Sequence, residues 1–397
     1  MTTAPSRPLD GMLVLDLGQI YNGPYCGLLL GFMGARVLKV EAPEGDVVRR
    51  RKRNVEPYPL VMLNSNKESV VLDLKHPDGK ALFLRLVRMA DVVVENFAPS
   101  VMARLGLDHA AMAAVNPGLV YCSISGFGQT GPLRERPAFA HIVQAISGLM
   151  HLERAEGPTP QVLYLQAADV LAGTHAFGAI AAALLRRGRT GQGAYIDVSM
   201  LETLVAAEDI TFGSLLNGGE ESPGPRRGMV VHRVGDGHVA IQTVGAPDLW
   251  ARMVAVMERP DLAQDPRFST PVGRRDNWPA LHALLCQWLD RFASVDEALA
   301  VLTAARVPCA PVLSPAEVIA HPHLAARGGF AEIDHATRGT VRITRTPFHL
   351  DGRPVEASGP APYRAGEHTR EVLGKVLGYA PERVEELLRL GAVAAPA

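Results

Sequence analysis

Short apolar runs alternate with segments of helical periodicity along the first third of the chain. Runs rich in Val, Leu and Ile occupy residues 12–17, 36–41, 70–74, 92–95 and 119–124. Apolar runs of this kind are typical of strands that are covered on both faces. Residues 23–33 and 76–89 are predicted to be helices between strands, and the first opens at Gly23-Pro24, where a proline costs no hydrogen bond. We therefore predict an α/β fold with a Rossmann-like layer of parallel strands.

The turn after the first predicted strand lacks the dinucleotide-binding fingerprint. Residues 18–24 read GQIYNGP, whereas a nicotinamide site needs Gly-x-Gly-x-x-Gly so that the backbone can approach a pyrophosphate. The sequence therefore argues against a nicotinamide-dependent dehydrogenase.

The middle of the chain predicts a long helix and then a break. Residues 174–187 are apolar nearly all round, which predicts a buried central helix. A strand at 195–198 and a helix from about residue 200 follow. The composition changes at 217–228 (NGGEESPGPRRG), a stretch typical of a linker or a mobile loop.

Beyond this stretch the pattern indicates a second, smaller domain. We expect a hairpin over 229–243 and helices at 250–257, 278–292 and 295–304. A strand at 340–345 and a helix from residue 368 are expected to return to the first domain. The prediction is thus a large domain built by both chain ends, residues 1–215 and 335–397, and a linker with a small α+β domain over 216–334.

Composition and charge indicate a soluble enzyme without a polyanionic partner. Hydrophobic residues make up 47% and charged residues 20%, and the formal net charge is -1, so we expect neither nucleic-acid nor membrane binding. No secretory leader is apparent, and the apolar stretches are shorter than the roughly 20 residues of a membrane span. The four cysteines form no CxxC pair, which predicts no metal site and no disulfide framework and suits a cytoplasmic location.

Five stretches in a fixed order carry the strongest signal. They are PLDG with VLDLG and GP (8–24), NSNKESVVLDLKHPDG (64–79), DVVVENFAPSVMARLGL (91–107), SGFGQTGP (125–132) and RGRTGQGAYIDVSM (187–200). Weaker echoes lie at 321–324 (HPHL) and 366–369 (GEHT). Together they resemble the family III CoA-transferases, which include formyl-CoA:oxalate and carnitine CoA-transferases and α-methylacyl-CoA racemases. The resemblance implies a CoA-transferase that uses CoA thioesters as substrates, without a prosthetic group, and forms an interlocked homodimer.

Asp169 falls where that family carries its catalytic aspartate. Position alone favours an N-cap of the apolar helix, because Asp is among the best N-cap residues, and the resemblance reverses that preference. The two roles are compatible, because the dipole of a helix N-terminus favours an ionised carboxylate. The resemblance implies that Asp169 attacks an acyl-CoA carbonyl, giving an aspartyl-acyl anhydride and then an aspartyl-CoA thioester.

The resemblance also implies a set of CoA-binding positions. In this chain they are Ile20, Tyr21, Asn22, Leu72, Lys75, Asn96, Phe97 and Arg104. The cations Lys75 and Arg104 suit phosphates, and Phe97 suits the adenine; without the resemblance they would be two solvated cations and a core Phe. The basic run at 49–53 could bind CoA phosphates, or it could be a solvated face or a dimer contact.

Three functional hypotheses stay open. Besides transfer, the chain could be a 2-methylacyl-CoA racemase, although the His-Asp pair of that branch aligns with Phe139-Ala140, and His141 is displaced by two residues. It could also be a catalytically silent acyl-CoA-binding protein.

The expected acyl pocket comprises Phe139, His141 and Gln144, and Arg226 with Arg227 could receive a second carboxylate. Some relatives carry a run of consecutive glycines in a loop that closes over the aspartyl intermediate; the stretch 217–228 has only the pair Gly218-Gly219 and need not be that loop.

Overall fold

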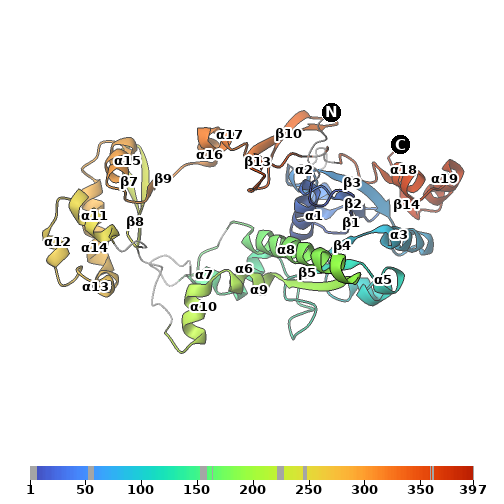
Figure 1. The fold of residues 1–397 in the computed structure, drawn as a ribbon, viewed down its shortest axis with the longest axis horizontal. Helices are drawn as coiled ribbons and strands as arrows, with labels where there is room; N and C mark the ends of the chain where they lie inside the picture. The colour runs from blue at the N-terminus through green and yellow to red at the C-terminus, as the bar shows by residue number, and fades with distance from the viewer. Residues whose placement is uncertain are drawn as a thin grey trace. The chain divides into compact units, whose positions relative to one another are not determined.

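The computed structural model describes residues 7–51, 58–152, 159–162, 164–220, 228–244, 248–357, 359 and 362–396. It divides the chain into two compact units (Figure 1). The large unit comprises residues 1–153, 160–221 and 325–397, and the small unit comprises residues 154–159 and 222–324. The main boundaries between the units thus fall at residues 221 and 325, whereas we expected them from the sequence at residues 215 and 335.

The centre of the large unit is a sheet that has seven strands in the described part of the chain. Their spatial order is β14-β3-β2-β1-β4-β5-β6. The strands are β1 (Leu13–Asp16), β2 (Arg36–Glu41), β3 (Lys67–Leu72), β4 (Val92–Glu95), β5 (Val120–Ser125), β6 (Ala194–Ser199) and β14 (Val393–Ala394). All neighbours are parallel except β14, which pairs antiparallel with β3. The predicted parallel α/β layer is confirmed.

The strand order reverses at β1, which has β2 on one side and β4 on the other. In open parallel sheets of this kind, ligands bind outside the carboxyl ends of the strands at the point of reversal. The turns that leave β1 and β4 are therefore the places to look for a site.

Apolar cores cover both faces of the sheet, as the unbroken apolar runs predicted. Val14 and Val92 belong to one core, which α1 (Asn22–Phe32) and α8 (Ala167–Thr190) cover. Leu15 and Val93, one residue further along each strand, belong to the other core, with α3 (Pro77–Met89), α5 (His109–Val115) and α19 (Pro381–Arg389). Successive strand residues point to opposite faces, so the helices are divided between the two faces.

The helix predicted at 174–187 is longer, and less buried, than expected. It is α8, which begins at Ala167. Its buried positions recur every four residues: Ala168, Ala172, Ala176, Ile180 and Leu184. The face away from this stripe is open in the single chain, where Leu185 is 69% exposed. The prediction of all-round burial is therefore wrong for the single chain. By length and composition alone α8 could also cross a membrane, which is a weak indication for a helix that packs on a core.

Several short elements complete the large unit. They are η1 (Val47–Arg51), α2 (Tyr58–Leu63), α4 (Val101–Arg104), α6 (Ala140–Ile146), α7 (Leu149–Leu152), α9 (Met200–Ala206), α10 (Asp209–Leu216), β10 (Phe330–His335), β11 (Gly339–Thr344), β12 (His349–Leu350), β13 (Arg353–Pro354), α18 (Thr369–Glu371) and η2 (Val372–Val376). The strand expected at 340–345 is β11, which pairs antiparallel with β10 in a separate two-stranded sheet.

The small unit packs helices on a three-stranded antiparallel sheet. The strands are β7 (Met229–Val234), β8 (Gly237–Gln242) and β9 (Cys309–Pro311). The helices are α11 (Leu249–Val256), α12 (Asp261–Gln264), α13 (Pro271–Asp276), α14 (Trp278–Leu289), α15 (Val295–Ala304) and α16 (Pro315–Ala320). Helix α17 (Pro322–Ala326) spans the boundary between the units.

Candidate active site

A cavity of about 820 Å³ lies in the large unit, where the strand order reverses. Its lining comes from the turns after β1, β4 and β5, the loop before α6, and the first turn of α8. The lining residues are 19–22, 96–99, 124–126 and 134–141, with Val48, Pro59, Gln166, Asp169 and Met200. The turns at the carboxyl ends of β1, β4 and β5 thus place the cavity at the edge of the sheet where the strand order reverses.

Asp169 is the third residue of α8 and lies in the cavity wall. The N-cap position belongs to Gln166, so the alternative of an N-cap at Asp169 does not hold. Burial raises the pKa of the Asp169 carboxyl to about 6, and hydrogen bonding to Asn22 together with the charge of His141 opposes this rise. Desolvation thus outweighs the opposing effects of Asn22 and His141 on this pKa. The carboxyl is still mostly ionised at neutral pH.

A close helix contact brings Asn22 to Asp169. Gly173 lies one helical turn beyond Asp169, and a Cβ at position 173 would be 2.7 Å from the carbonyl oxygen of Asn22. The same Cβ would be 3.0 Å from the Tyr25 ring. Only glycine leaves room for α8 to approach the start of α1 in this way. Burial and the charges of Tyr25 and Asp169 raise the pKa of Tyr21, so this phenol also lies near Asp169.

Asn96 joins the turn after β4 to the turn after β1. Its Oδ1 accepts a hydrogen bond from the Gln19 amide at 2.8 Å. Its Nδ2 donates to the Gln19 carbonyl at 2.8 Å and to Asn22 Oδ1 at 2.6 Å. Asn22 Nδ2 in turn points to the Met200 sulfur at 3.4 Å. The predicted positions Asn22 and Asn96 thus form one hydrogen-bonded unit.

Five of the eight predicted CoA-binding positions line this cavity: Ile20, Tyr21, Asn22, Asn96 and Phe97.

The other three lie outside its lining. Leu72 is buried in β3, the Lys75 side chain is exposed, and Arg104 donates to Ser100 Oγ at 2.6 Å.

Two of the three predicted acyl-pocket residues reach the cavity. Phe139 and His141 line it, and the buried Nε2 of His141 has no hydrogen-bond partner among the described residues. Gln144 lies behind the wall, where its Nε2 donates to the Leu165 carbonyl at 2.8 Å.

Two side chains of the basic run at 49–53, those of Arg49 and Arg50, lie in the described part of the chain. Arg49 forms a two-pronged ion pair with Glu41, at 2.7 and 3.0 Å. Arg50 is exposed. The side chain of Arg51, and the whole of residues 52 and 53, lie outside the described part of the chain, as do Arg226 and Arg227.

Sequence reasoning missed the cations that line the cavity. Arg134 and Arg136, which flank Glu135, lie on the loop before α6. The signal was the short charged run in GPLRERP, directly after one of the recognised stretches. Within the described residues, no group of three or more His, Cys, Asp or Glu side chains could hold a metal ion.

Comparison with known proteins identifies a family for this sequence. The sequence matches CoA-transferase family III over residues 9–369. It is 39% identical to an acetyl-CoA:oxalate CoA-transferase of Acetobacter aceti, over 89% of this chain and 90% of the relative. It is 32% identical to a succinyl-CoA–D-citramalate CoA-transferase of Chloroflexus aurantiacus, over 94% and 95%.

Solved structures give the same fold. A CAIB/BAIF family protein from Brucella suis superimposes with a TM-score of 0.80 at 32% identity, over 94% of this chain and 100% of that one. Rv3272 from Mycobacterium tuberculosis superimposes with a TM-score of 0.82 at 30% identity, over 92% and 99%.

Proposed function

Since the chain belongs to CoA-transferase family III, we propose that it moves CoA from an acyl-CoA thioester to a free carboxylic acid through covalent intermediates on Asp169. The observation that carries this proposal is the position of the Asp169 carboxyl. It is ionised near neutral pH, partly buried, next to Asn22, and in the wall of a cavity large enough for the reacting end of an acyl-CoA.

The first half-reaction moves CoA onto the enzyme. A carboxylate oxygen of Asp169 attacks the thioester carbonyl, the C–S bond breaks, and an aspartyl-acyl anhydride and CoA thiolate form. The thiolate then attacks the aspartyl carbonyl and expels the donor acid, which leaves an aspartyl-CoA thioester. An ionised carboxylate needs no general base for this attack.

The second half-reaction runs the same steps with the acceptor acid. Its carboxylate attacks the aspartyl thioester and releases CoA thiolate, and the thiolate then attacks the acyl carbonyl of the new anhydride. The products are the new acyl-CoA and free Asp169. Water must stay away from both intermediates, because hydrolysis would discharge them. The partial burial of Asp169 serves that requirement.

We assign the expected CoA-binding residues to successive parts of the CoA molecule. The cavity-lining residues Ile20, Tyr21, Asn22 and Asn96 suit the pantetheine arm and the reacting thioester. Phe97, at the same wall, suits the ring end. Leu72, Lys75 and Arg104 lie outside the lining, and we assign them to the ADP end of CoA, with the two cations facing phosphates.

Phe139 and His141 are assigned to the acyl group, with Gln144 holding the wall behind them. Several relatives are named for oxalate, succinyl or glutarate substrates. We therefore place the substrates of this chain among short acids of that kind, one as the CoA thioester and the other free.

We further propose the interlocked homodimer that the family resemblance implies, in the cytoplasm. The open apolar face of α8 supports it, as do exposed apolar side chains nearby in sequence: Leu185, Ile210 and Leu216 are 68–81% exposed in the single chain. Static light scattering should give twice the mass of the 42.5 kDa chain. A monomeric mass would remove this part of the proposal.

Trapping the covalent intermediate tests the mechanism. The enzyme is mixed with succinyl-CoA or acetyl-CoA, quenched with hydroxylamine, and its mass is measured intact and after digestion. We expect a hydroxamate on the peptide that contains Asp169, and none in Asp169→Ala. Unmodified Asp169 with every donor that the enzyme turns over would remove the covalent mechanism.

The racemase alternative has one observation in its favour, because His141 lies in the same cavity as Asp169. Racemisation exchanges the α-proton, so it would bring solvent deuterium into a 2-methylacyl-CoA. Transfer through Asp169 brings none.

A further inference from the structure

We propose that Lys39 and Asp46, a buried ion pair outside the cavity lining, are positioning residues that fix the 18–22 turn and so hold Asn22 against Asp169. This inference rests on the proposed role of Asp169 as the nucleophile. It assigns a function to two charges that the catalytic scheme does not use.

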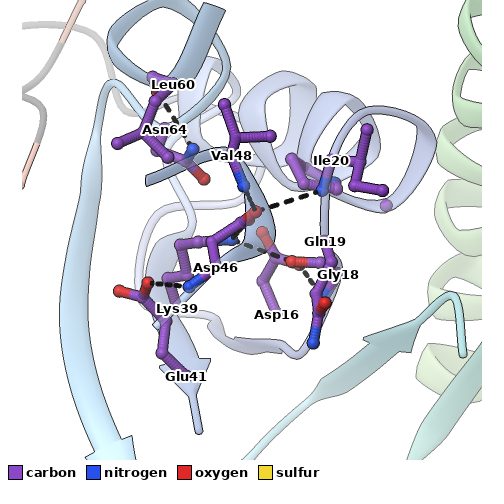
Figure 2. Close-up of polar contacts among 12 residues, drawn as sticks. Asp16, Gly18, Gln19, Ile20, Lys39, Glu41, Asp46, Val48, Leu60 and Asn64 are labelled. Carbon is purple, nitrogen blue, oxygen red and sulfur yellow. Dashed lines mark hydrogen bonds and ion pairs between the residues drawn. The ribbon is translucent and has the colours of Figure 1, made fainter. Parts of the chain in front are cut away.

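The two charges contact the main chain of the turn directly (Figure 2). Lys39 Nζ donates to the Gly18 carbonyl at 2.8 Å and lies 2.9 Å from Asp46 Oδ2. Asp46 Oδ1 accepts from the Ile20 amide at 3.4 Å and from the Val48 amide at 2.9 Å. Each end of the ion pair thus holds one residue of the turn.

Ile20 explains why the turn needs such support. Its φ is 66°, in the left-handed region, which a β-branched side chain disfavours. Isolated from its surroundings, this turn would relax to another conformation. A conformation of this kind persists only where the neighbouring structure imposes it, and here Asp46 holds the Ile20 amide itself.

A second buried ion pair holds the two ends of the turn. Asp16 Oδ1 accepts from the Gly18 amide at 2.8 Å, and its Oδ2 lies 2.7 Å from Lys67 Nζ. Lys67 also donates to the Pro24 carbonyl at 2.7 Å. Asn96 also hydrogen-bonds to the Gln19 backbone. These contacts together restrain the main chain of the turn at Gly18, Gln19 and Pro24.

The ion pair is fully desolvated, and this favours a positioning role over a stabilising one. The side chains of Lys39 and Asp46 are each 1% exposed. Burying two charges carries a desolvation penalty that can exceed their mutual attraction, and apolar side chains can often replace such a pair without loss of stability. Apolar replacements, however, could not hold the Gly18 carbonyl or the Ile20 amide.

The turn is coupled to the chemistry through Asn22. Hydrogen bonding to Asn22 lowers the pKa of Asp169 against the effect of burial. His141 and Tyr21 also interact electrostatically with Asp169, and Arg134, Glu135 and Arg136 line the same cavity. A relaxed turn should therefore raise the pKa of Asp169 and misplace the acyl-CoA.

A double variant, Lys39→Met with Asp46→Leu, distinguishes an effect of the ion pair on folding from an effect on the position of Asn22. Its thermal unfolding, its kcat/KM for CoA transfer and the pH dependence of kcat/KM are compared with wild type. We expect cooperative unfolding close to that of wild type, a loss of about 10- to 100-fold in kcat/KM, and an acid limb moved to higher pH. Asp46→Asn can keep an acceptor for the Ile20 amide, so its kcat/KM should lie between those of wild type and the double variant.

Asp91→Asn is the matched control. Asp91 Oδ1 pairs with Arg187 at 2.7 Å, and its Oδ2 accepts from the Leu13 amide at 2.8 Å. It therefore resembles Asp46 in chemistry, but it lies at the other end of β1. This variant should lose stability and keep the pH profile of wild type.

Two outcomes overturn the inference. The first is a folded double variant with the kcat/KM and pH profile of wild type. The second is a double variant that does not fold while Asp91→Asn does, because the pair would then serve folding itself. Trapping of the Asp169 hydroxamate in the wild type is read separately. Its absence would remove the proposed mechanism, whereas its presence with unchanged variants would remove only this inference.

Discussion

Gly173 packs against the main-chain carbonyl of Asn22 so closely that a Cβ at position 173 would lie 2.7 Å from that oxygen. This contact sets the distance between α8, which carries Asp169, and the turn that carries Asn22. The catalytic geometry therefore depends on a residue without a side chain, one helical turn away from the nucleophile.

Gly173→Ala should separate α8 from α1 and reduce activity more than stability alone would explain. Overpacking of this kind costs about 1–3 kcal/mol, and we expect kcat/KM to fall by about 10-fold or more because Asp169 moves away from Asn22. Denaturant unfolding and transfer kinetics check both effects.

Gly178→Ala is the control in the same helix, because a Cβ at position 178 would meet nothing within 4 Å in the single chain, and static light scattering checks that the variant keeps the oligomeric state of wild type. Alanine is the better helix former, so this variant should gain up to about 1 kcal/mol of stability and keep full activity. Equal activity of the two variants would contradict the role given to the Gly173 contact.

Activity should rise with pH through the pKa of Asp169. Burial raises this pKa from 3.8 to about 6, so the nucleophilic carboxylate is present above pH 6 and is lost as the pH falls. Below that value kcat/KM should fall about tenfold per pH unit. Rates measured from pH 4.5 to 8 with saturating acceptor acid check this. A flat profile between pH 5 and 7 would contradict it.

Glu95 should make the stability of the protein pH-dependent. Burial raises its pKa from 4.5 to about 7, although hydrogen bonds from Ser123 and the Phe97 amide oppose the rise. The folded state therefore binds this proton more tightly than the unfolded state. Its contribution to stability is present below pH 4.5 and is lost as the pH rises to about 7.

The variant Glu95→Gln removes this titration. Relative to wild type, its free energy of unfolding should improve by about 2–3 kcal/mol between pH 4.5 and pH 7.5. Urea denaturation at both pH values measures the difference. The prediction is wrong if the gap between variant and wild type does not change with pH.

His141→Gln should shift the pH profile without abolishing transfer. The charge of His141 lowers the pKa of Asp169, so its removal should move the acid limb to higher pH, while turnover at pH 8 persists and a loss of acyl binding appears as a raised KM. Loss of all turnover, together with deuterium incorporation at the α-carbon by the wild type, would instead support a racemase.

Most of the parallel sheet could be predicted because its strands are rich in Val, Leu and Ile, and the strand at 36–41 was predicted with the bounds that the structure shows. The start of α8 at Ala167 was missed, because Asp169 and Gly173 interrupt the apolar pattern, and the N-cap alternative placed the start of the helix at Asp169. β14 was missed because two residues carry no period, and only tertiary pairing with β3 makes them a strand.

The site was predictable where it lies on the turns that follow strands. Ile20 to Asn22 and Asn96 line the cavity because the topology places both turns at one sheet edge. Arg134 and Arg136 were missed because they lie on a loop. The path of a loop decides which of its residues reach a cavity, and hydrophobic periodicity in the sequence does not predict that path. Lys39 could not be recognised as a functional residue, because it is one of three charged residues in the strand RVLKVE and its partner Asp46 lies in the following loop.

The pairing of β14 with β3 has a consequence for synthesis of the chain. Val393 and Ala394 pair with Leu72 and Val71, and the Val71 and Ser69 amides donate to Thr369 Oγ1 and His368 Nδ1. A nascent chain that stops before residue 368 leaves this border of the sheet without those partners, and an open strand border is a template for aggregation. Residues 368–394 therefore cover this border of the sheet, and a truncation before residue 368 should expose β3 and promote aggregation.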